Sequence, residues 1–144
     1  MRQAILSLGL AVLVSGCETM SLGGSPGSPP PTAALDLGDW SHAPPTDTLS
    51  QFQTAISARY AAGSSLSDAT ADLRRNDFTC AANNDTTGRG EPPTQICRKT
   101  VNADNCTGTW QVHLFDAHGD GHILRARALF DKRCGREGLL GGPS

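Results

Sequence analysis

Residues 106–134 read CTGTWQVHLFDAHGDGHILRARALFDKRC, and this stretch decides the fold. Apolar and polar residues alternate over Thr109–Asp116 and again over His122–Phe130, which is the period of a half-buried strand. Residues 117–121 between them (AHGDG) are typical of a turn. The stretch therefore predicts a β-hairpin whose open end brings Cys106 roughly opposite Cys134.

The alternation assigns the side chains of this hairpin to two faces. In the first strand, one face takes three apolar residues and the other a mixed set: Trp110, Val112 and Leu114 against Gln111, His113 and Phe115. In the second strand, one side is wholly apolar and the other carries two arginines: Leu124, Ala126, Ala128 and Phe130 against Ile123, Arg125, Arg127 and Leu129.

Two further strands are expected just before the hairpin. Phe78-Thr79-Cys80 begins a short strand, and Thr94–Val101 (TQICRKTV) forms a longer one. Residues 83–93 between them form a polar loop that contains Gly88, Gly90 and two prolines, which is typical of a connection. Together with the hairpin, these segments predict a small antiparallel sheet of three to four strands.

The cysteines predict two disulfides. The chain has five cysteines, and Cys17 is assigned to another role below, which leaves an even set of four. An even set in an exported chain indicates disulfides, and four cysteines allow three pairings. Cys80 and Cys97 flank the loop over residues 83–93, as Cys106 and Cys134 flank the hairpin. We therefore predict the pairs Cys80–Cys97 and Cys106–Cys134.

Two helices are expected before the strands. Residues 47–62 carry Leu49, Phe52, Ile56 and Tyr60 at helical spacing, which gives one apolar stripe. Thr46 or Asp47 can cap this helix, and Gly63 is typical of its end. Ser65 or Ser67 can cap a second helix that ends near Arg75, with Asn76-Asp77 as the stop. The fold class is therefore α+β: two N-terminal helices packed on a small disulfide-bonded antiparallel sheet.

The remaining segments give the domain organisation. Residues 18–45 are rich in Gly, Ser and Pro and indicate a flexible tether. Leu35, Leu37 and Trp40 interrupt this composition, and they either pack back onto the domain or bind a partner. We therefore expect a tether over residues 17–45, an α+β domain over residues 46–134 and a disordered tail over residues 135–144.

The first 17 residues resemble the start of a bacterial lipoprotein precursor. Residues 4–14 (AILSLGLAVLV) follow one basic residue and have the length of a signal-peptide core. Val14-Ser15-Gly16-Cys17 then resembles a lipobox. The resemblance implies a signal peptide over residues 1–16 and diacylglycerol, with acyl chains such as palmitate, on the Cys17 thiol. Glu18 in place of Asp implies transfer to the outer membrane, with inner-membrane retention as the alternative.

The composition limits the partners. After loss of Arg2 the chain keeps 11 of its 12 Lys and Arg residues against 14 Asp and Glu, a net charge of −3. Such a chain has no electrostatic footprint for nucleic acid and no basic amphipathic stretch that would hold it to lipid by itself. We therefore expect membrane attachment through Cys17 alone.

The turn of the hairpin invites a metal hypothesis. Asp116–Ile123 (DAHGDGHI) resembles the first eight positions of an EF-hand loop, but His118 stands at the third position and Arg127 at the twelfth, where Glu is required. His113, His118 and His122 also raise the possibility of zinc or copper. A hairpin turn explains the same glycines and aspartates, so we expect no metal and no cofactor.

The sequence contains no recognisable set of catalytic residues. The paired cysteines leave no free thiol after Cys17 is lipidated, and no phosphate-binding glycine loop precedes a helix. We therefore expect a protein that is not an enzyme. Arg74, Arg75, Arg98 and Lys99 are interpreted either as a solvated face or as a basic patch that docks an acidic partner.

The order of elements resembles a known class of lipoproteins. The stretch Tyr60–Ala69 (YAAGSSLSDA), leading to Leu73 and Phe78, is similar to the helix-turn-helix of the SmpA/OmlA (BamE-like) lipoproteins and the β-lactamase-inhibitor-protein-like folds. The resemblance covers residues 47–130 and implies two helices on one face of an antiparallel sheet. The usual Gly-x-Pro after the second helix is absent, and the two-disulfide pattern is closer to uncharacterised Gram-negative lipoproteins.

These observations lead to a functional hypothesis. We expect a periplasm-facing, membrane-anchored lipoprotein that acts without catalysis as an envelope structural, assembly or interaction protein, through its sheet face or its helix pair. The first alternative is a periplasmic inhibitor or ligand-binding module acting on a hydrolase. The second is a metal-binding protein that uses the histidine-rich turn.

Overall fold

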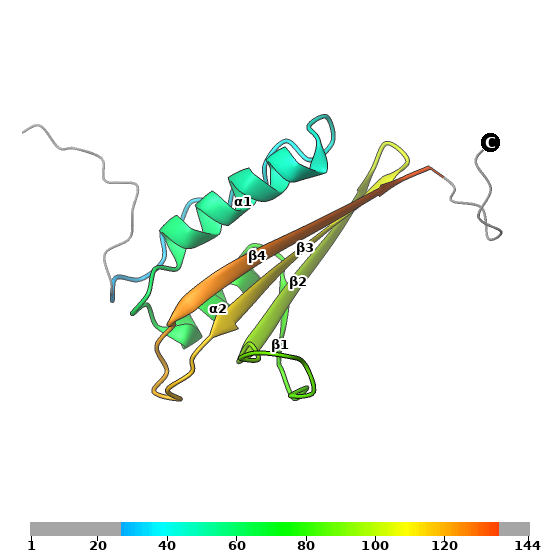
Figure 1. Cartoon of the computed structure of the whole chain (residues 1–144). Helices are drawn as coiled ribbons and strands as arrows, with labels where there is room; N and C mark the ends of the chain where they lie inside the picture. The colour runs from blue at the N-terminus through cyan, green and yellow to red at the C-terminus, as the bar shows by residue number, and fades with distance from the viewer. Residues whose placement is uncertain (1–26, 136–144) are drawn as a thin grey trace, which may run out of the picture.

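The structure, a computed structural model, describes residues 27–135. Its six elements are two helices followed by four strands (Figure 1): α1 Pro45–Arg59, α2 Leu66–Arg75, β1 Thr79–Ala82, β2 Gln95–Ala103, β3 Cys106–Phe115 and β4 Arg125–Cys134. The strands form one antiparallel sheet in the order β1-β2-β3-β4. The α+β class and the disulfide-bonded antiparallel sheet are therefore confirmed, but the helices are not N-terminal, since α1 begins only at Pro45. Cys17, the expected signal peptide and the tail after residue 135 lie outside the described residues.

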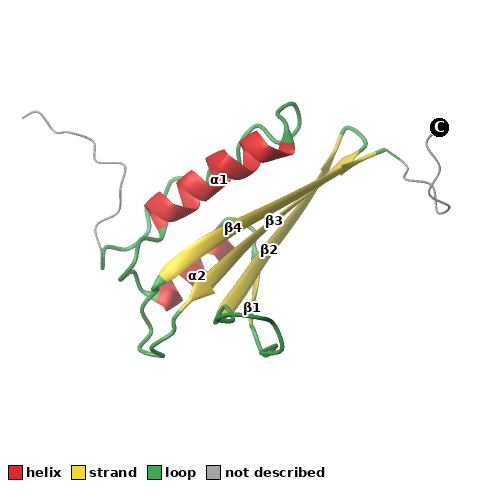
Figure 2. Cartoon of the chain, viewed as in Figure 1, coloured by secondary structure: helices red, strands yellow, loops and turns green. Residues whose placement is uncertain are grey.

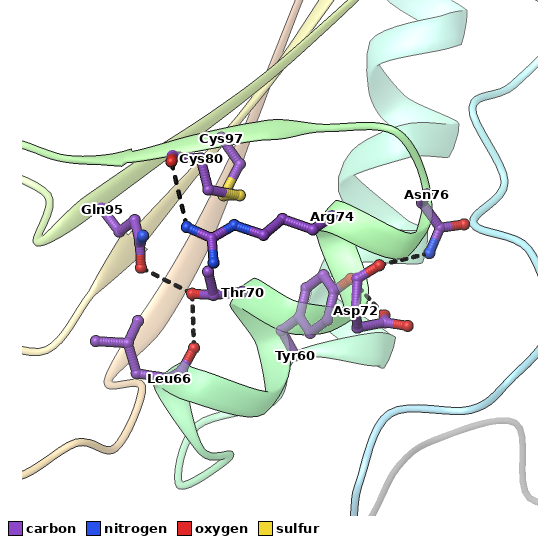
Figure 3. Close-up of a disulfide and its surroundings, with 9 residues drawn as sticks. All are labelled: Tyr60, Leu66, Thr70, Asp72, Arg74, Asn76, Cys80, Gln95 and Cys97. Carbon is purple, nitrogen blue, oxygen red and sulfur yellow. Dashed lines mark hydrogen bonds between the residues drawn. A yellow bond between two sulfur atoms is a disulfide. The ribbon is translucent and has the colours of Figure 1, made fainter.

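Both helices lie on one face of the sheet (Figure 2). α1 packs along β4 and the shorter α2 packs near β1. Thr70 of α2 donates a hydrogen bond to Gln95 Oε1 of β2 at 2.7 Å, close to the Cys80–Cys97 disulfide (Figure 3). The opposite face of the sheet has no helix over it among residues 27–135, which leaves it open to a partner.

Both predicted disulfides are present. Cys80 bonds to Cys97, and Cys106 bonds to Cys134. Each pair occupies directly opposite positions of neighbouring strands, β1 with β2 and β3 with β4. The hairpin prediction explains the second pair, because a register that places Val112 opposite Ala128 also places Cys106 opposite Cys134.

The helix ends differ in part from the prediction. Neither Thr46 nor Asp47 caps α1: the helix begins at Pro45 after Pro44, with no side-chain cap. Proline suits this position because its fixed φ is already helical and it has no N–H to satisfy. α1 also ends at Arg59, not at residue 62. For α2, the predicted cap is confirmed, since Ser65 Oγ accepts a hydrogen bond from Asp68 N at 3.2 Å.

The last strand starts later than the alternation predicted. β4 begins at Arg125, because residues 121–123 instead bond to the connection between the helices. Gly63 N donates to Ile123 O at 2.7 Å, and Ile123 N donates to Ser64 O at 2.8 Å. As a result Ile123 is buried and Leu124 is 44% exposed. The predicted sides of these two residues are therefore wrong.

Part of the predicted tether belongs to the folded unit. We call Pro31–Pro44 the N-terminal strap, which runs along α1 and precedes both helices (Figure 1). Leu35 is 8% exposed, and Trp40 packs edge-on against Trp110 with ring centroids 5.4 Å apart. Trp110 Nε1 donates to Leu37 O at 3.2 Å. The packing-back interpretation is therefore confirmed for these residues, and the strap contacts the domain from before the expected boundary at residue 46.

The tryptophan pair needs a residue without a side chain beneath it. A Cβ on Gly108 of β3 would lie 2.7 Å from Trp110 Cη2 and 2.9 Å from Trp40 Cε3. Such a contact forces both rings to move, and overpacking of this kind costs about 1–3 kcal/mol. Gly108 is thus the site where the strap is seated on the sheet.

Gly108→Ala is expected to lower the free energy of unfolding by about 1–3 kcal/mol and to shift tryptophan fluorescence to the red as Trp40 leaves its site. Urea unfolding followed by fluorescence measures both effects. Gly88→Ala is the matched control, because nothing lies within 4 Å of a Cβ there. Equal stability of the two variants would contradict the close packing of the strap on β3.

Candidate functional site

The open face of the sheet is the candidate functional site, and we call it the outer sheet face. In antiparallel pairs, residues directly opposite each other point to the same side, and alternate residues along a strand share a face. The strand register therefore gives its members: Thr79 and Ala81 of β1, Ile96, Arg98, Thr100 and Asn102 of β2, Thr107, Thr109, Gln111, His113 and Phe115 of β3, and Arg125, Arg127, Leu129, Asp131 and Arg133 of β4.

A histidine between two arginines marks the centre of this face. His113 lies opposite Ile96 on β2 and opposite Arg127 on β4. Arg98 lies one row away, opposite Gln111. Within residues 27–135, neither Arg98 nor Arg127 pairs with an acidic side chain. The centre of the outer sheet face therefore carries uncompensated positive charge.

Burial and the two arginines keep His113 neutral. The half-buried position of the imidazole lowers the pKa of His113 below its ordinary value of 6.5, and the positive charges of Arg127 and Arg98 lower it further. His113 Nε2 lies 3.4 Å from Gln111 Oε1. At pH 7 the imidazole is therefore an uncharged group that a nearby anion would help to protonate.

The other arginines of this face are already paired. Arg125 lies with its guanidinium carbon 3.5 Å from the centroid of the Phe115 ring, and it bonds to Glu91 Oε2 at 3.3 Å. Arg133 bonds to Asp131 at 3.0 Å. The uncompensated charge is therefore confined to the rows around His113.

The loop between β1 and β2 makes a hollow over one end of the face. The hollow measures about 410 Å³, with Ile96, His113 and Phe115 among its lining and the loop over residues 83–93 along its side. Asn83 holds the base of the loop by donating to Pro93 O at 3.0 Å. Arg125 and Arg127 line the same hollow. It therefore combines an apolar surface with positive charge.

A second hollow continues the first across β1 and β2. It measures about 570 Å³, and it shares Asn83 and Ile96 with the first hollow. Arg98 contributes to its lining. The two hollows together form a shallow depression whose lining comes from all four strands and includes both Arg98 and Arg127.

The basic patch, which was one of two interpretations of Arg74, Arg75, Arg98 and Lys99, is not a single surface. Adjacent strand residues point to opposite faces, so Arg98 joins the outer sheet face and Lys99 points toward the helices. Lys99 Nζ donates to Asn76 O at 2.9 Å, and Arg75 pairs with Asp72. Arg125 and Arg127 are the basic neighbours that the sequence interpretation missed, and the alternation of the final strand was the signal for them.

In the turn over residues 116–122, which was considered as a metal-binding loop, the aspartate carboxylates accept hydrogen bonds from the backbone of the turn itself. The Asp116 carboxylate accepts hydrogen bonds from Asp120 N at 3.2 Å and Gly121 N at 2.9 Å, and Asp120 accepts one from His122 N at 2.9 Å. Over residues 27–135, no group of three or more His, Cys, Asp or Glu side chains is placed to hold a metal ion. His113 lies on the outer sheet face, while His118 and His122 belong to the turn.

Comparison with known proteins gives no relative for this chain. No protein-family model matches it, and neither the curated proteins nor the solved structures contain a match. None of the helices in the described part of the chain has the length and apolar character needed to cross a membrane.

Proposed function

We propose that this protein is a lipid-anchored envelope lipoprotein whose domain binds another envelope protein through the outer sheet face, without catalysis. The observation that carries the proposal is that face: it is open, hollowed, and positively charged at its centre by Arg98 and Arg127. The lipobox-like Val14–Cys17 and the two disulfides support an exported, oxidised location. The proposed place is the periplasmic side of the outer membrane.

The resemblance to the SmpA/OmlA (BamE-like) lipoproteins also supports the proposed function. A helix pair covers one face of an antiparallel sheet here, as that resemblance implies. An assembly or scaffolding role follows because a domain with one covered face and one open, charged face is suited to docking. The alternative of an inhibitor or ligand-binding module draws on the same hollow, with a soluble hydrolase as the partner.

The lipid anchor is tested with the full chain in a Gram-negative host. Labelled palmitate is expected to enter the wild-type chain and to be absent from Cys17→Ser, which loses the acceptor thiol. Membrane fractionation should place the wild type with the outer membrane and leave the variant out of the membrane pellet. Glu18→Asp is the matched change beside it, expected to keep the label and move the chain toward the inner membrane. Equal labelling of Cys17→Ser would refute the anchor.

The binding face is tested by photocrosslinking in cells. A crosslinking amino acid at Gln111 probes the centre of the outer sheet face, and one at Ala58, exposed on α1, is the control. We expect a discrete adduct with an outer-membrane assembly protein from position 111 and none from position 58. An adduct with a soluble periplasmic hydrolase would favour the inhibitor alternative. The same adducts from both positions would contradict docking through the sheet.

A further inference from the structure

The outer sheet face carries charge opposite to that of the chain. The whole chain has a net charge of −2, yet this face contributes four arginines from β2 and β4 against one acidic residue, Asp131. Arg125 and Arg133 are neutralised by Glu91 and Asp131. What remains is a pair of cations, Arg98 and Arg127, on either side of His113. An extended anionic surface would also face the acidic remainder of the molecule. A short acidic segment of a partner would contact only the basic centre, so such a segment suits this face better.

The two cations near one imidazole oppose its protonation. Like charges on neighbouring rows repel, and the imidazole between them is held neutral by the same field. A carboxylate bound there would remove the repulsion and would form paired hydrogen bonds with a guanidinium, whose planar donors match its two oxygens. The arrangement is therefore unfavourable when empty and favourable when an anion is bound.

Apolar residues lie beside Arg98 and Arg127, so the site favours a ligand that has apolar groups as well as negative charge. Ile96 and Phe115 line the hollow beside it, and Pro92 and Pro93 belong to the adjacent loop. Leu129 lies in the next row of β4, opposite Gln111. An occupant that alternates carboxylates with apolar side chains would satisfy both features. A sulfated polysaccharide supplies the charge but not the apolar groups.

We propose that the depression around Arg98, His113 and Arg127 binds an acidic polypeptide segment of the partner, with a carboxylate between the two arginines and an apolar side chain against Ile96 and Phe115. The inference rests on the proposed function and names the chemistry of its partner. The segment lies across the strands in the two connected hollows. Each carboxylate forms hydrogen bonds with guanidinium groups, and the bound charge draws a proton onto His113.

Proton uptake gives this site a pH signature. Burial, Arg127 and Arg98 hold the free imidazole neutral, while Asp85, Arg89, Glu91 and Arg125 are the other charged groups that line its hollow. A bound carboxylate favours the charged imidazolium, so binding takes up a proton. Affinity is therefore expected to rise as the pH falls from about 7.5 to about 5.5, where peptide carboxylates remain ionised.

The test uses the full chain, purified in detergent, and a fluorescent decapeptide of alternating Asp and Leu. Fluorescence anisotropy is expected to show binding that weakens with salt and strengthens at lower pH. The double variant Arg98→Gln/Arg127→Gln should bind at least tenfold more weakly. Arg74→Gln/Lys132→Gln removes the same charge from the helix-covered side of the molecule, since Lys132 lies opposite Gly108 on that side of the sheet, and should change binding less than twofold. Circular dichroism confirms that each variant is folded.

Three further arms can overturn the inference. A peptide of alternating Asn and Leu should bind at least tenfold more weakly than the acidic peptide, and equal binding would refute the role of charge. Tighter binding of anionic phosphatidylglycerol vesicles or of a sulfated polysaccharide than of the acidic peptide would assign the site to another polyanion. A His113→Gln variant that keeps the full pH dependence would refute the coupled protonation.

Failure of this inference is distinguishable from failure of the proposed function. If the crosslink from Gln111 to an envelope protein survives Arg98→Gln/Arg127→Gln, and the acidic peptide does not bind, docking stands and the acidic-segment inference falls. If the peptide binds but Gln111 gives no envelope adduct, the site chemistry stands and the proposed role falls.

Discussion

Reducing both disulfides is expected to lower the free energy of unfolding by about 6 kcal/mol, which is the largest single effect we foresee. The bonds close loops with sequence separations of 17 and 28 residues, and loops of this size each contribute about 3 kcal/mol by restricting the unfolded chain. The loops do not overlap, so their contributions add. Domains of this kind have a total stability of about 5–15 kcal/mol, so the reduced protein is expected to lie close to unfolding.

Urea unfolding followed by far-ultraviolet circular dichroism, with and without reductant, measures this effect. Two pair variants separate the bonds: Cys80→Ser/Cys97→Ser and Cys106→Ser/Cys134→Ser, each expected to lose about half. Reductant should not destabilise a variant in which all four residues are serine. A loss below about 2 kcal/mol on full reduction would mean that the sheet and the strap hold the fold without the crosslinks.

Replacing Asp72 with alanine is expected to cost about 3–5 kcal/mol. Asp72 lies in α2 with its side chain 1% exposed. Its carboxylate accepts hydrogen bonds from Arg59 Nε at 2.6 Å, Tyr60 Oη at 2.7 Å and Arg75 Nη2 at 2.8 Å. Without it, the Arg59 guanidinium, 8% exposed, is left without its carboxylate partner, and an uncompensated buried charge is the costly product.

The Asp72 carboxylate also makes the stability of the fold depend on pH. Burial raises the pKa of the Asp72 carboxyl, but the hydrogen bonds from Arg59 and Tyr60 outweigh it and the net pKa lies below its ordinary value of 3.8. A carboxyl with a lowered pKa stabilises the fold above pH 3.8, and this stabilisation is lost as the pH falls through the lower, folded-state pKa. The pKa of the Tyr60 phenol is raised, mostly by burial and secondly by its hydrogen bond to Asp72.

Chemical unfolding between pH 7 and pH 2 measures both effects of Asp72. Asp131→Ala is the matched control, because its pair with Arg133 is on the surface, with side chains 63% and 75% exposed, and such pairs contribute less than about 1 kcal/mol. The acid-dependent loss should be smaller in Asp72→Ala than in the wild type. A loss of equal size in both proteins would assign the acid sensitivity to other carboxyls.

The sequence predicted the parts of the fold that depend on short-range patterns. The hairpin over residues 106–134 followed from alternation, and the same spacing predicted the Cys106–Cys134 bond. The stripe through Phe52, Ile56 and Tyr60 predicted the buried side of α1, and all three are at most 1% exposed. Ser65 was one of two candidates for the cap of α2. These features are local, so neighbouring residues determine them.

The parts that were missed depend on contacts between distant residues. The strap has the composition of a linker, and only the gap over Gly108 and the ring of Trp110 give Trp40 a place to pack. Ile123 is buried because Gly63 and Ser64 bond to its backbone, which strand alternation cannot show. The cluster of Arg98, His113 and Arg127 needed the register of three strands at once. Asp72 gave no signal, since a carboxylate in a helix is ordinarily solvated.

The N-terminal strap also determines how a mechanical load enters the domain. Tension on the chain before residue 31 first reaches Pro31 and Ala33, whose carbonyl oxygens accept hydrogen bonds from Arg59 Nη2 at 2.7 Å each. It then reaches Leu35, whose N–H donates to Asn76 Oδ1 at 2.7 Å, and finally Trp40 on Trp110. We expect these contacts to release one after another, so that a pulled domain extends by the length of the strap before α1 or the sheet bears the force.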